Sequence, residues 1–223
     1  MKCPVCKGEA WKPPLDKKNT PKYGEIKYKC KGCDHTWFKM TNAEAAGFHE
    51  DNVVWRFEDF EKRDGFHNRR IEILKDVMDW PPKSALDCGC GDGRFLELVG
   101  AKRMVGIDVS SEAPGEGPYD YISGSFVTEK IDGQFDLVTS FHSLEHIGSC
   151  AGAFQKILSL SKGVVAVEVP VCRQMRWFNG GHVHGFSHRS YEMLIFKYAK
   201  EFKTLAQVKH IQGKSVLWVG RRK

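Results

Sequence analysis

Residues 85–96 read ALDCGCGDGRFL, and this stretch decides the fold. An apolar run enters a Gly-x-Gly-x-Gly turn, and a helix is expected after the turn, over 92–99. Glycines are needed where a backbone must turn sharply and approach a ligand closely. The pattern therefore predicts a strand, a ligand-binding loop and a helix in succession.

An acidic residue follows this loop at the spacing of a nucleotide-binding unit. Asp108 comes 21 residues after Asp87, at the end of the run 104–108. An acid at the tip of a second strand can accept hydrogen bonds from both hydroxyls of a ribose. A loop that binds pyrophosphate prefers Gly-x-Gly-x-x-Gly. Here Asp87 and Asp92 would repel pyrophosphate and suit a positively charged ligand group instead.

The chain after residue 80 alternates strand-like and helix-like stretches. Such alternation predicts an α/β domain with a mainly parallel sheet and helices on both faces. The last two strands are joined by a short link, which favours an antiparallel hairpin at the edge of the sheet. Strands are expected at 84–88, 104–109, 120–122, 135–140, 164–169, 202–209 and 215–220, and further helices at 150–160 and 188–199.

The composition divides the chain into three parts. Residues 1–40 are rich in lysine and cysteine, and residues 41–80 form a mostly helical bridge, with apolar helical spacing over 66–78 and a stop at Pro81. Residues 81–223 form the α/β domain. No apolar run approaches the roughly 20 residues that span a bilayer, and no signal-peptide core begins the chain, so a cytoplasmic protein without a membrane segment is expected.

Four of the eight cysteines form two Cys-x2-Cys pairs before residue 34. Each pair lets two thiolates face one ion, and two pairs complete a tetrahedral zinc site. Gly8 and Gly32 beside the pairs are expected to permit the tight turns. Forty residues with few large aliphatic side chains would hardly fold without the metal. The predicted structural zinc ligands of this ribbon are Cys3, Cys6, Cys30 and Cys33.

The ribbon is also strongly basic. The ten lysines and four acids of residues 1–40 account for the whole net charge of +6. Lysines interleaved with aromatic residues suit phosphate contact and base stacking, so nucleic acid is one possible partner of residues 1–40. The alternative is a basic surface that only stabilises the fold or a dimer, and the sequence sets no oligomeric state.

The glycine loop and its partners resemble the class I S-adenosylmethionine-dependent methyltransferases. Residues 85–93, 105–108 and 135–140 match the first, second and fourth motifs of that family, within a resemblance that covers roughly residues 65–223. It implies a Rossmann-like, seven-stranded sheet and S-adenosylmethionine as cofactor. By position the loop would cradle the methionine part, Asp108 the ribose and Val109 the adenine. Ser125 stands where the family often has an acid on the adenine amino group. The predicted cofactor-binding residues are Asp87, Gly89, Gly91, Gly93, Asp108, Val109, Ser125 and Ser140.

Five histidines follow the fourth and fifth predicted strands, where the family has its active site. Methyl transfer is an in-line displacement that mainly needs alignment, and a hydroxyl acceptor also benefits from a general base such as histidine. The predicted catalytic residues are His146, His184 and Glu145. In a second interpretation, His146 and His184 only tie loops together through hydrogen bonds.

A third interpretation places a divalent metal at His142, Glu145 and His146, with His184 or His188 as a further ligand. This arrangement is similar to the Glu-x-x-Glu-His site of small-RNA terminal 2′-O-methyltransferases and quinone-pathway O-methyltransferases. Since His142 replaces the first glutamate of that pattern, a metal-free site is favoured.

The resemblance of the ribbon bears on the substrate. Cysteine-rich N-terminal modules are found on many bacterial methyltransferases that act on sugars or other small metabolites, which favours O-methylation of a small-molecule acceptor such as a sugar or sugar nucleotide. The alternative is an RNA or DNA methyltransferase that grips nucleic acid through the ribbon. A partner subunit without activity is disfavoured by the intact glycine loop and Asp108.

Overall fold

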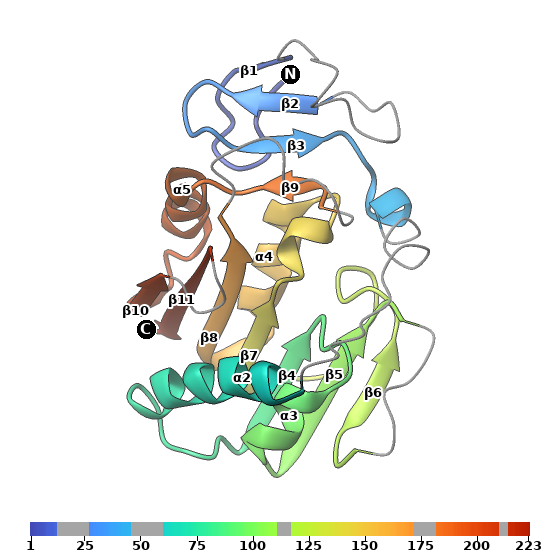
Figure 1. Ribbon diagram of the computed structural model, residues 1–223, viewed down its shortest axis with the longest axis vertical. Helices are drawn as coiled ribbons and strands as arrows, with labels where there is room; N and C mark the ends of the chain where they lie inside the picture. Colours follow the sequence, from blue (N-terminus) through green and yellow to red (C-terminus); the bar gives the residue numbers. More distant parts are fainter. Residues whose placement is uncertain (13–26, 46–59, 111–116, 172–181, 210–213) are drawn as a thin grey trace.

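The computed structural model describes residues 1–12, 27–45, 60–110, 117–171, 182–209 and 214–223. Its centre is a seven-stranded sheet with the order β10-β11-β8-β7-β4-β5-β6. The strands from β8 to β6 pair in parallel, whereas β11 runs antiparallel to both of its neighbours. The predicted α/β sheet and its C-terminal hairpin are thereby confirmed (Figure 1). The strands are β4 (Ser84–Cys88), β5 (Arg103–Asp108), β6 (Asp120–Ser123), β7 (Phe135–Phe141), β8 (Ser161–Pro170), β10 (Phe202–Lys209) and β11 (Ser215–Arg222).

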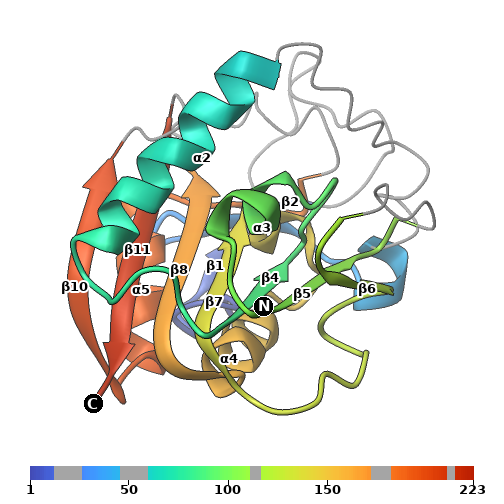
Figure 2. The same ribbon diagram turned by 90° about the horizontal axis from the view of Figure 1, so that it is seen from below.

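Helices cover both faces of this sheet, as Figure 2 shows. In β8, Val165, Val167 and Val169 join one apolar core, whereas Val164 and Ala166 join the other. This alternation follows from the two-residue period of a strand, and it makes a continuously apolar sequence suit a strand that is buried on both sides. One face is covered by α2 (Phe60–Lys75) and α3 (Arg94–Val99), and the other by α4 (Cys150–Ser159) and α5 (His188–Tyr198).

The ends of the helices show where the sequence pattern was informative. The Ser187 hydroxyl accepts a hydrogen bond from the Ser190 N–H, and the Ser187 N–H donates one to the Ser190 hydroxyl, so the two serines cap the start of α5 reciprocally. Helix α2 begins six residues before the predicted 66–78 and ends at Lys75. Apolar spacing marks the packed face of a helix, and the charged first turn of α2 lacks that signal. Among the described residues, no helix has the length and apolarity needed to cross a membrane.

The N-terminal ribbon is a small sheet that borrows a strand from the other end of the chain. Its own strands are β1 (Ala10–Trp11), β2 (Lys27–Cys30) and β3 (Thr36–Phe38). Strand β9 (His184–Gly185) extends this sheet, with Thr36 opposite Gly185 and Trp37 opposite His184 (Figure 1). A two-residue strand carries no period in the sequence, so this pairing could not be predicted.

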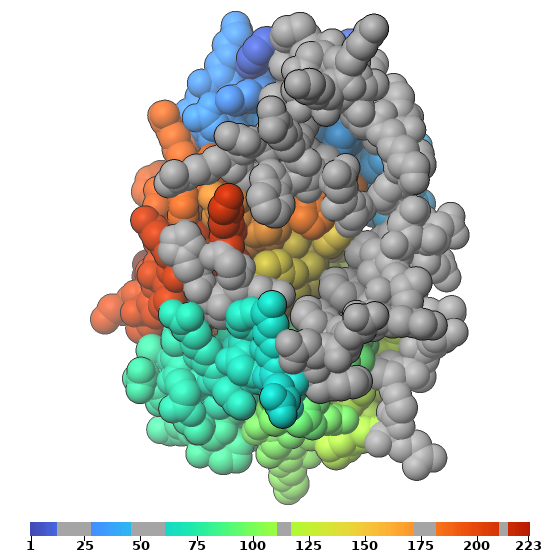
Figure 3. All heavy atoms as spheres, in the orientation of Figure 1, coloured from blue at the N-terminus to red at the C-terminus, as the bar shows by residue number. Residues whose placement is uncertain are grey.

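The ribbon also shares a core with the larger domain. Val5 and Trp37 are buried in the same apolar cluster as Phe186 and Tyr191, and the Ser187 hydroxyl donates a hydrogen bond of 2.7 Å to the Cys33 carbonyl. Figure 3 shows the described ribbon residues stacked on one end of the domain. The division into parts at residues 40 and 80 stays a prediction, and residues 46–59 of the bridge lie outside the described residues.

A short segment after the ribbon is held closely against the domain. The Phe38 N–H donates to the Val183 carbonyl, and the turn that begins at Thr41 buries Ala45 beside Val183. Gly148 lies directly under this turn, since a Cβ placed on Gly148 would lie 2.6 Å from the carbonyl carbon of Thr41. The segment therefore depends on a residue without a side chain at position 148.

We expect Gly148→Ala to destabilise the protein by about 1–3 kcal/mol, because the added methyl group meets backbone rather than a flexible side chain. Gly65→Ala is the matched control, since a Cβ at this exposed position in α2 meets nothing within 4 Å. That change should stabilise by about 0.5–1 kcal/mol through helix propensity. Urea unfolding of the three proteins measures both effects, and equal stability of Gly148→Ala and wild type would contradict the tight packing.

Candidate functional site

The glycine loop after β4 has the left-handed backbone that its sequence predicts. Gly89, Gly91 and Gly93 have φ angles of +80°, +55° and +74°. The Gly89 N–H donates a 2.7 Å hydrogen bond to the Ile107 carbonyl, which ties the loop to the end of β5. A Cβ at Gly89 would lie 1.9 Å from the Ser143 Oγ, so the loop after β7 also rests on this glycine. Two constraints, conformation and space, therefore require glycine at position 89.

Asp108 lies beside this loop at the tip of β5, as the sequence predicts. Its carboxylate is buried and accepts hydrogen bonds from the Gly91 N–H (2.9 Å) and the Ser110 N–H (3.1 Å). A carboxylate has about four lone-pair sites, so two are left for a ligand. This matches the two hydroxyls of a ribose.

A pocket with about 520 Å³ of empty space, part of it open to solvent, lies beside Asp108. Four predicted residues line it, namely Gly89, Asp108, Val109 and Ser125, and the predicted base His146 does so too. The remaining lining residues come from the bridge, from beside Ser125 and from the loop around His146. They are Asn42, Ala45, Gly124, Phe126, His142, Ser143 and Ile147.

Asp87, Gly91, Gly93 and Ser140 are outside the described lining of the pocket. Asp87 lies beneath the glycine loop, where it accepts a 2.7 Å hydrogen bond from the Thr139 hydroxyl. Burial raises the pKa of Asp87 to about 7, although the Thr139 bond opposes this shift. Ser140 is fully buried and donates to the Cys88 carbonyl. Asp87 and Ser140 thus support the glycine loop without lining the pocket.

A buried carboxylate, that of Glu145, lies next to His146 in the wall of the pocket. Glu145 is fully buried in the short 3₁₀ helix η1 (Leu144–His146), and its Oε1 lies 3.6 Å from the His142 Nδ1 and 3.8 Å from the His146 Nε2. Among the described residues, no hydrogen-bond partner reaches either oxygen of Glu145. A buried carboxylate of this kind needs a nearby cation.

His142 supplies that cation and joins Glu145 to a second buried carboxylate. Its Nε2 lies 3.3 Å from Glu168, which also accepts a 2.7 Å hydrogen bond from Arg70 on α2. Burial alone would lower the pKa of His142, but Glu145 and Glu168 raise it to about 9. His142 and Arg70 likewise outweigh burial and lower the pKa of Glu168 to about 2. Two cations thus balance two carboxylates.

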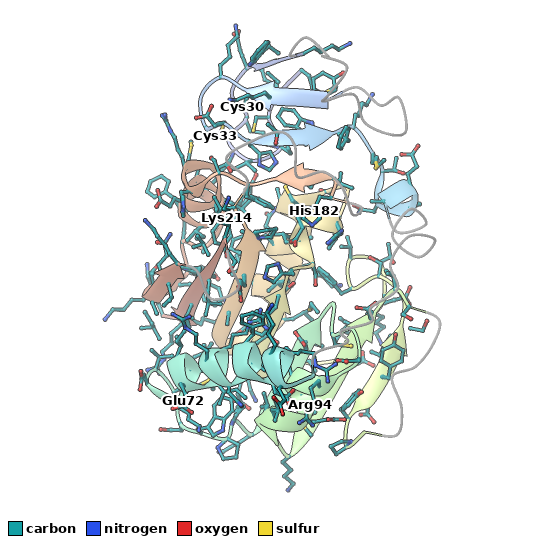
Figure 4. The ribbon with its side chains drawn as sticks, viewed as in Figure 1. Cys30, Cys33, Glu72, Arg94, His182 and Lys214 are labelled. Atoms are coloured by element: carbon teal, nitrogen blue, oxygen red, sulfur yellow. The ribbon has the colours of Figure 1, made fainter. Side chains whose placement is uncertain are left out.

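His146 and His182 complete the cluster around Glu145. Their rings are in edge-to-face contact with centroids 4.7 Å apart, and one ligand atom from each of Glu145, His146 and His182 falls within 4.8 Å of the others. Figure 4 shows His182 at the end of the domain that faces the ribbon. The sequence predicts His184 or His188 as the further ligand of a cation site. The structure instead brings His182 beside Glu145 and His146.

His184, a predicted catalytic residue, is not among the described residues that line the pocket. Its Nε2 donates to the Gly148 carbonyl (3.2 Å), and its Nδ1 accepts a 3.0 Å hydrogen bond from His35 of the ribbon. Burial lowers the pKa of His184 to about 4, so the ring is neutral. The pairing of β9 with β3 turns this side chain toward the ribbon. The interpretation of His184 as a loop tie fits these contacts better than the catalytic one.

The four ribbon cysteines converge as predicted. The Sγ atoms of Cys3 and Cys33 are 3.7 Å apart, those of Cys6 and Cys30 are 3.4 Å apart, and all four sulfurs lie within 4.8 Å of one another. Tetrahedral zinc with bonds of about 2.3 Å would separate its sulfurs by about 3.8 Å. The four thiolates therefore fit a zinc ion.

The glycines beside these cysteines have a different role from the predicted one. The left-handed residues of the two turns are Lys7 (φ +66°) and Asp34 (φ +59°). Gly8 and Gly32 instead donate their N–H groups to the sulfurs of Cys6 and Cys30, each at 3.3 Å. A Cβ at Gly8 would crowd the Cys6 sulfur at 3.1 Å. Space around the sulfur, rather than conformational freedom, explains glycine at position 8.

Comparison with known proteins identifies the larger domain. Residues 62–207 match the family described as a methyltransferase domain. The ubiquinone biosynthesis O-methyltransferase of Burkholderia vietnamiensis is 33% identical over 147 residues, which cover 55% of this chain and 61% of that protein. The enzyme of the same name from Dechloromonas aromatica is 26% identical over 145 residues, which cover 59% of this chain and 53% of that protein. The chain thus spans less than two thirds of the length of these relatives.

Solved structures share the fold at low sequence identity. The N-methyltransferase NodS from Bradyrhizobium japonicum, in complex with S-adenosyl-L-homocysteine, has a TM-score of 0.62 at 16% identity, covering 82% of this chain and 99% of that one. The 1,6-didemethyltoxoflavin-N1-methyltransferase from Burkholderia thailandensis, with S-adenosylhomocysteine bound, has a TM-score of 0.62 at 13% identity, covering 86% and 97%. At this identity the likeness shows the fold alone.

Proposed function

The chain belongs to the methyltransferase-domain family, and we propose that it transfers the methyl group of S-adenosylmethionine to a hydroxyl oxygen of a small metabolite. The observation that carries this proposal is one pocket that is lined by Asp108, by Gly89 of the glycine loop and by His146. A cofactor site and a candidate base thereby face the same space.

The cofactor is assigned to the glycine-loop side of the pocket. Asp108 keeps two lone-pair sites for the ribose hydroxyls, while Val109 and Ser125 lie at the tips of β5 and β6, where the family resemblance places the adenine. The buried Asp87 beneath the loop provides negative charge for the ammonium and sulfonium groups. This arrangement supports binding of a positively charged nucleoside rather than a dinucleotide.

The acceptor is assigned to the side of the pocket with His146. As the acceptor oxygen attacks the methyl carbon, the carbon–sulfur bond breaks and sulfur keeps its electron pair. His146 takes the hydroxyl proton, and the Glu145 carboxylate, 3.8 Å from the His146 Nε2, stabilises the imidazolium that forms. The products are a methyl ether and S-adenosylhomocysteine.

The names of the curated relatives favour an oxygen acceptor, since they are O-methyltransferases. A sugar or sugar nucleotide is the acceptor class that the resemblance of the ribbon supports. Two ribbon lysines are less suited to phosphate contact, because Lys29 pairs with Asp34 at 3.3 Å and Lys31 with Glu9 at 3.6 Å. A small-molecule acceptor is therefore the preferred proposal.

A second mode of acceptor activation is favoured by the unusual surroundings of Glu145. This carboxylate, His146 and His182 would fit a divalent cation, with oxygen and imidazole ligands in reach of one point. When bound, such an ion would act as a Lewis acid on the acceptor oxygen. The charge of His142 argues for the metal-free form, because an imidazolium already neutralises Glu145.

Cofactor binding is tested by calorimetry with S-adenosylhomocysteine. Asp108→Ala should abolish measurable binding, because it removes both acceptors for the ribose.

The affinity of the wild type for S-adenosylhomocysteine should rise up to about tenfold from about pH 6 to about pH 8. Asp87 is protonated and neutral below its raised pKa, and it becomes negatively charged as the pH rises through that value. The charge of Arg70 opposes the raised pKa of Asp87, and the charge of Asp108 adds to it. Asp87→Asn, as a matched control, should remove this rise, and no binding by wild type at millimolar ligand would refute the cofactor assignment.

Acceptor activation is tested with a chelator on active enzyme, after mass spectrometry has identified an acceptor among sugars, sugar nucleotides and hydroxylated aromatics. We expect full activity in the chelator, and a kcat lowered by roughly 10²–10⁴-fold in His146→Ala with little change in S-adenosylhomocysteine affinity. His184→Gln is the comparison, and its main effect should be on stability. Activity that is lost in the chelator and restored by Mg²⁺ or Mn²⁺ would replace the base by the divalent cation.

We further propose that the ribbon holds one structural zinc through Cys3, Cys6, Cys30 and Cys33. Atomic emission analysis of protein purified without chelator should give one zinc per chain. Cys30→Ser should lower the zinc content and the melting temperature, because the ribbon has little apolar core of its own. Cys90→Ser lies outside the cluster and should keep the zinc. A wild-type chain free of zinc would disprove this assignment.

A further inference from the structure

The segment that follows the ribbon forms part of the pocket wall. Asn42 and Ala45 line the pocket together with residues at the tips of β5 and β6, which are Val109, Gly124 and Ser125. Figure 1 shows the short helical turn at 42–45 beyond the upper ends of β5 and β6, and Figure 2 shows it beside β6. A stretch about sixty residues before β5 in the sequence thus closes the adenine side of the proposed site.

This turn is held in place on several sides. The Thr41 N–H donates to the Glu44 carboxylate (2.7 Å), and the Glu44 N–H donates to the Thr41 hydroxyl (3.2 Å). Ala45 is buried against Phe38 and Val183. Such reciprocal capping and packing fix the side chain between them, Asn42, at the pocket.

The orientation of the Asn42 amide follows from one hydrogen bond. The backbone N–H of Ser149 donates to the Asn42 Oδ1 at 2.8 Å, and only the amide oxygen can accept it. The Nδ2 group is therefore the free end of the amide and carries two N–H donors. Among the described residues, none accepts a hydrogen bond from Nδ2.

We propose that the Asn42 Nδ2 donates a hydrogen bond to N1 of the cofactor adenine, and this inference rests on the proposed cofactor site. Asp108 holds the ribose end, so the pyrimidine edge of the base points away from it, toward the wall that Asn42 and Ala45 form. Adenine N1 is an acceptor, which matches the donors of Nδ2. The bridge behind the ribbon thereby selects the base.

The test compares S-adenosylhomocysteine with S-inosylhomocysteine, in which N1 carries a proton and donates. Asn42→Asp keeps the oxygen that accepts from Ser149 but replaces the donor by an acceptor. We expect this variant to bind S-adenosylhomocysteine at least about tenfold more weakly, and to bind the inosyl compound as well as or better than wild type does. Asn42→Ala should lose about fivefold for S-adenosylhomocysteine.

Ala43→Asp is the matched control, because it adds the same charge at an exposed neighbouring position outside the described lining of the pocket. It should keep the wild-type preference for the adenine compound. Equal weakening of both ligands in Asn42→Asp would show a structural role and overturn the adenine contact, as would unchanged affinities in both Asn42 variants. Wild type that binds neither ligand would instead refute the proposed cofactor site itself.

Discussion

Two buried carboxylates, Glu145 and Glu168, must be neutralised, and the way this is done sets the geometry of the site. Arg70 reaches Glu168 from α2, and His142 lies between Glu168 and Glu145. His142 takes up this position with a left-handed φ of +54°, which is uncommon for a residue other than glycine. The charge balance thus fixes the loop after β7 relative to α2 and β8, and this loop carries His146 into the pocket.

The ribbon is structurally continuous with the domain on which it rests. Backbone pairing of β3 with β9, the hydrogen bond between His35 and His184, and a common apolar cluster join the two. Both rings of the histidine pair are neutral, since burial lowers the pKa of each. The ribbon therefore determines where its last residues leave the sheet, and hence where Asn42 meets the pocket.

The strands were predictable because apolar runs in a doubly covered sheet are long and continuous. Strands β4 and β10 have the predicted bounds, and the other strands of the large sheet differ by three residues or fewer at each end. The cofactor loop was predictable because left-handed turns and close contacts admit few residues other than glycine. The histidines near the candidate site were harder to assign, since His182 and His184 are two residues apart, and only the path of β9 separates the one near Glu145 from the one that binds His35.

The sequence by itself determined the α/β fold, the glycine loop with Asp108, and the four converging cysteines, because each depends on residue types at short, fixed spacing. The tertiary structure alone decided that His142 pairs with two carboxylates, that His184 belongs to the ribbon contact, and that Asn42 lines the pocket. These features join segments that lie up to about 150 residues apart in the chain. No local pattern encodes such contacts, because they arise from how separately formed elements pack.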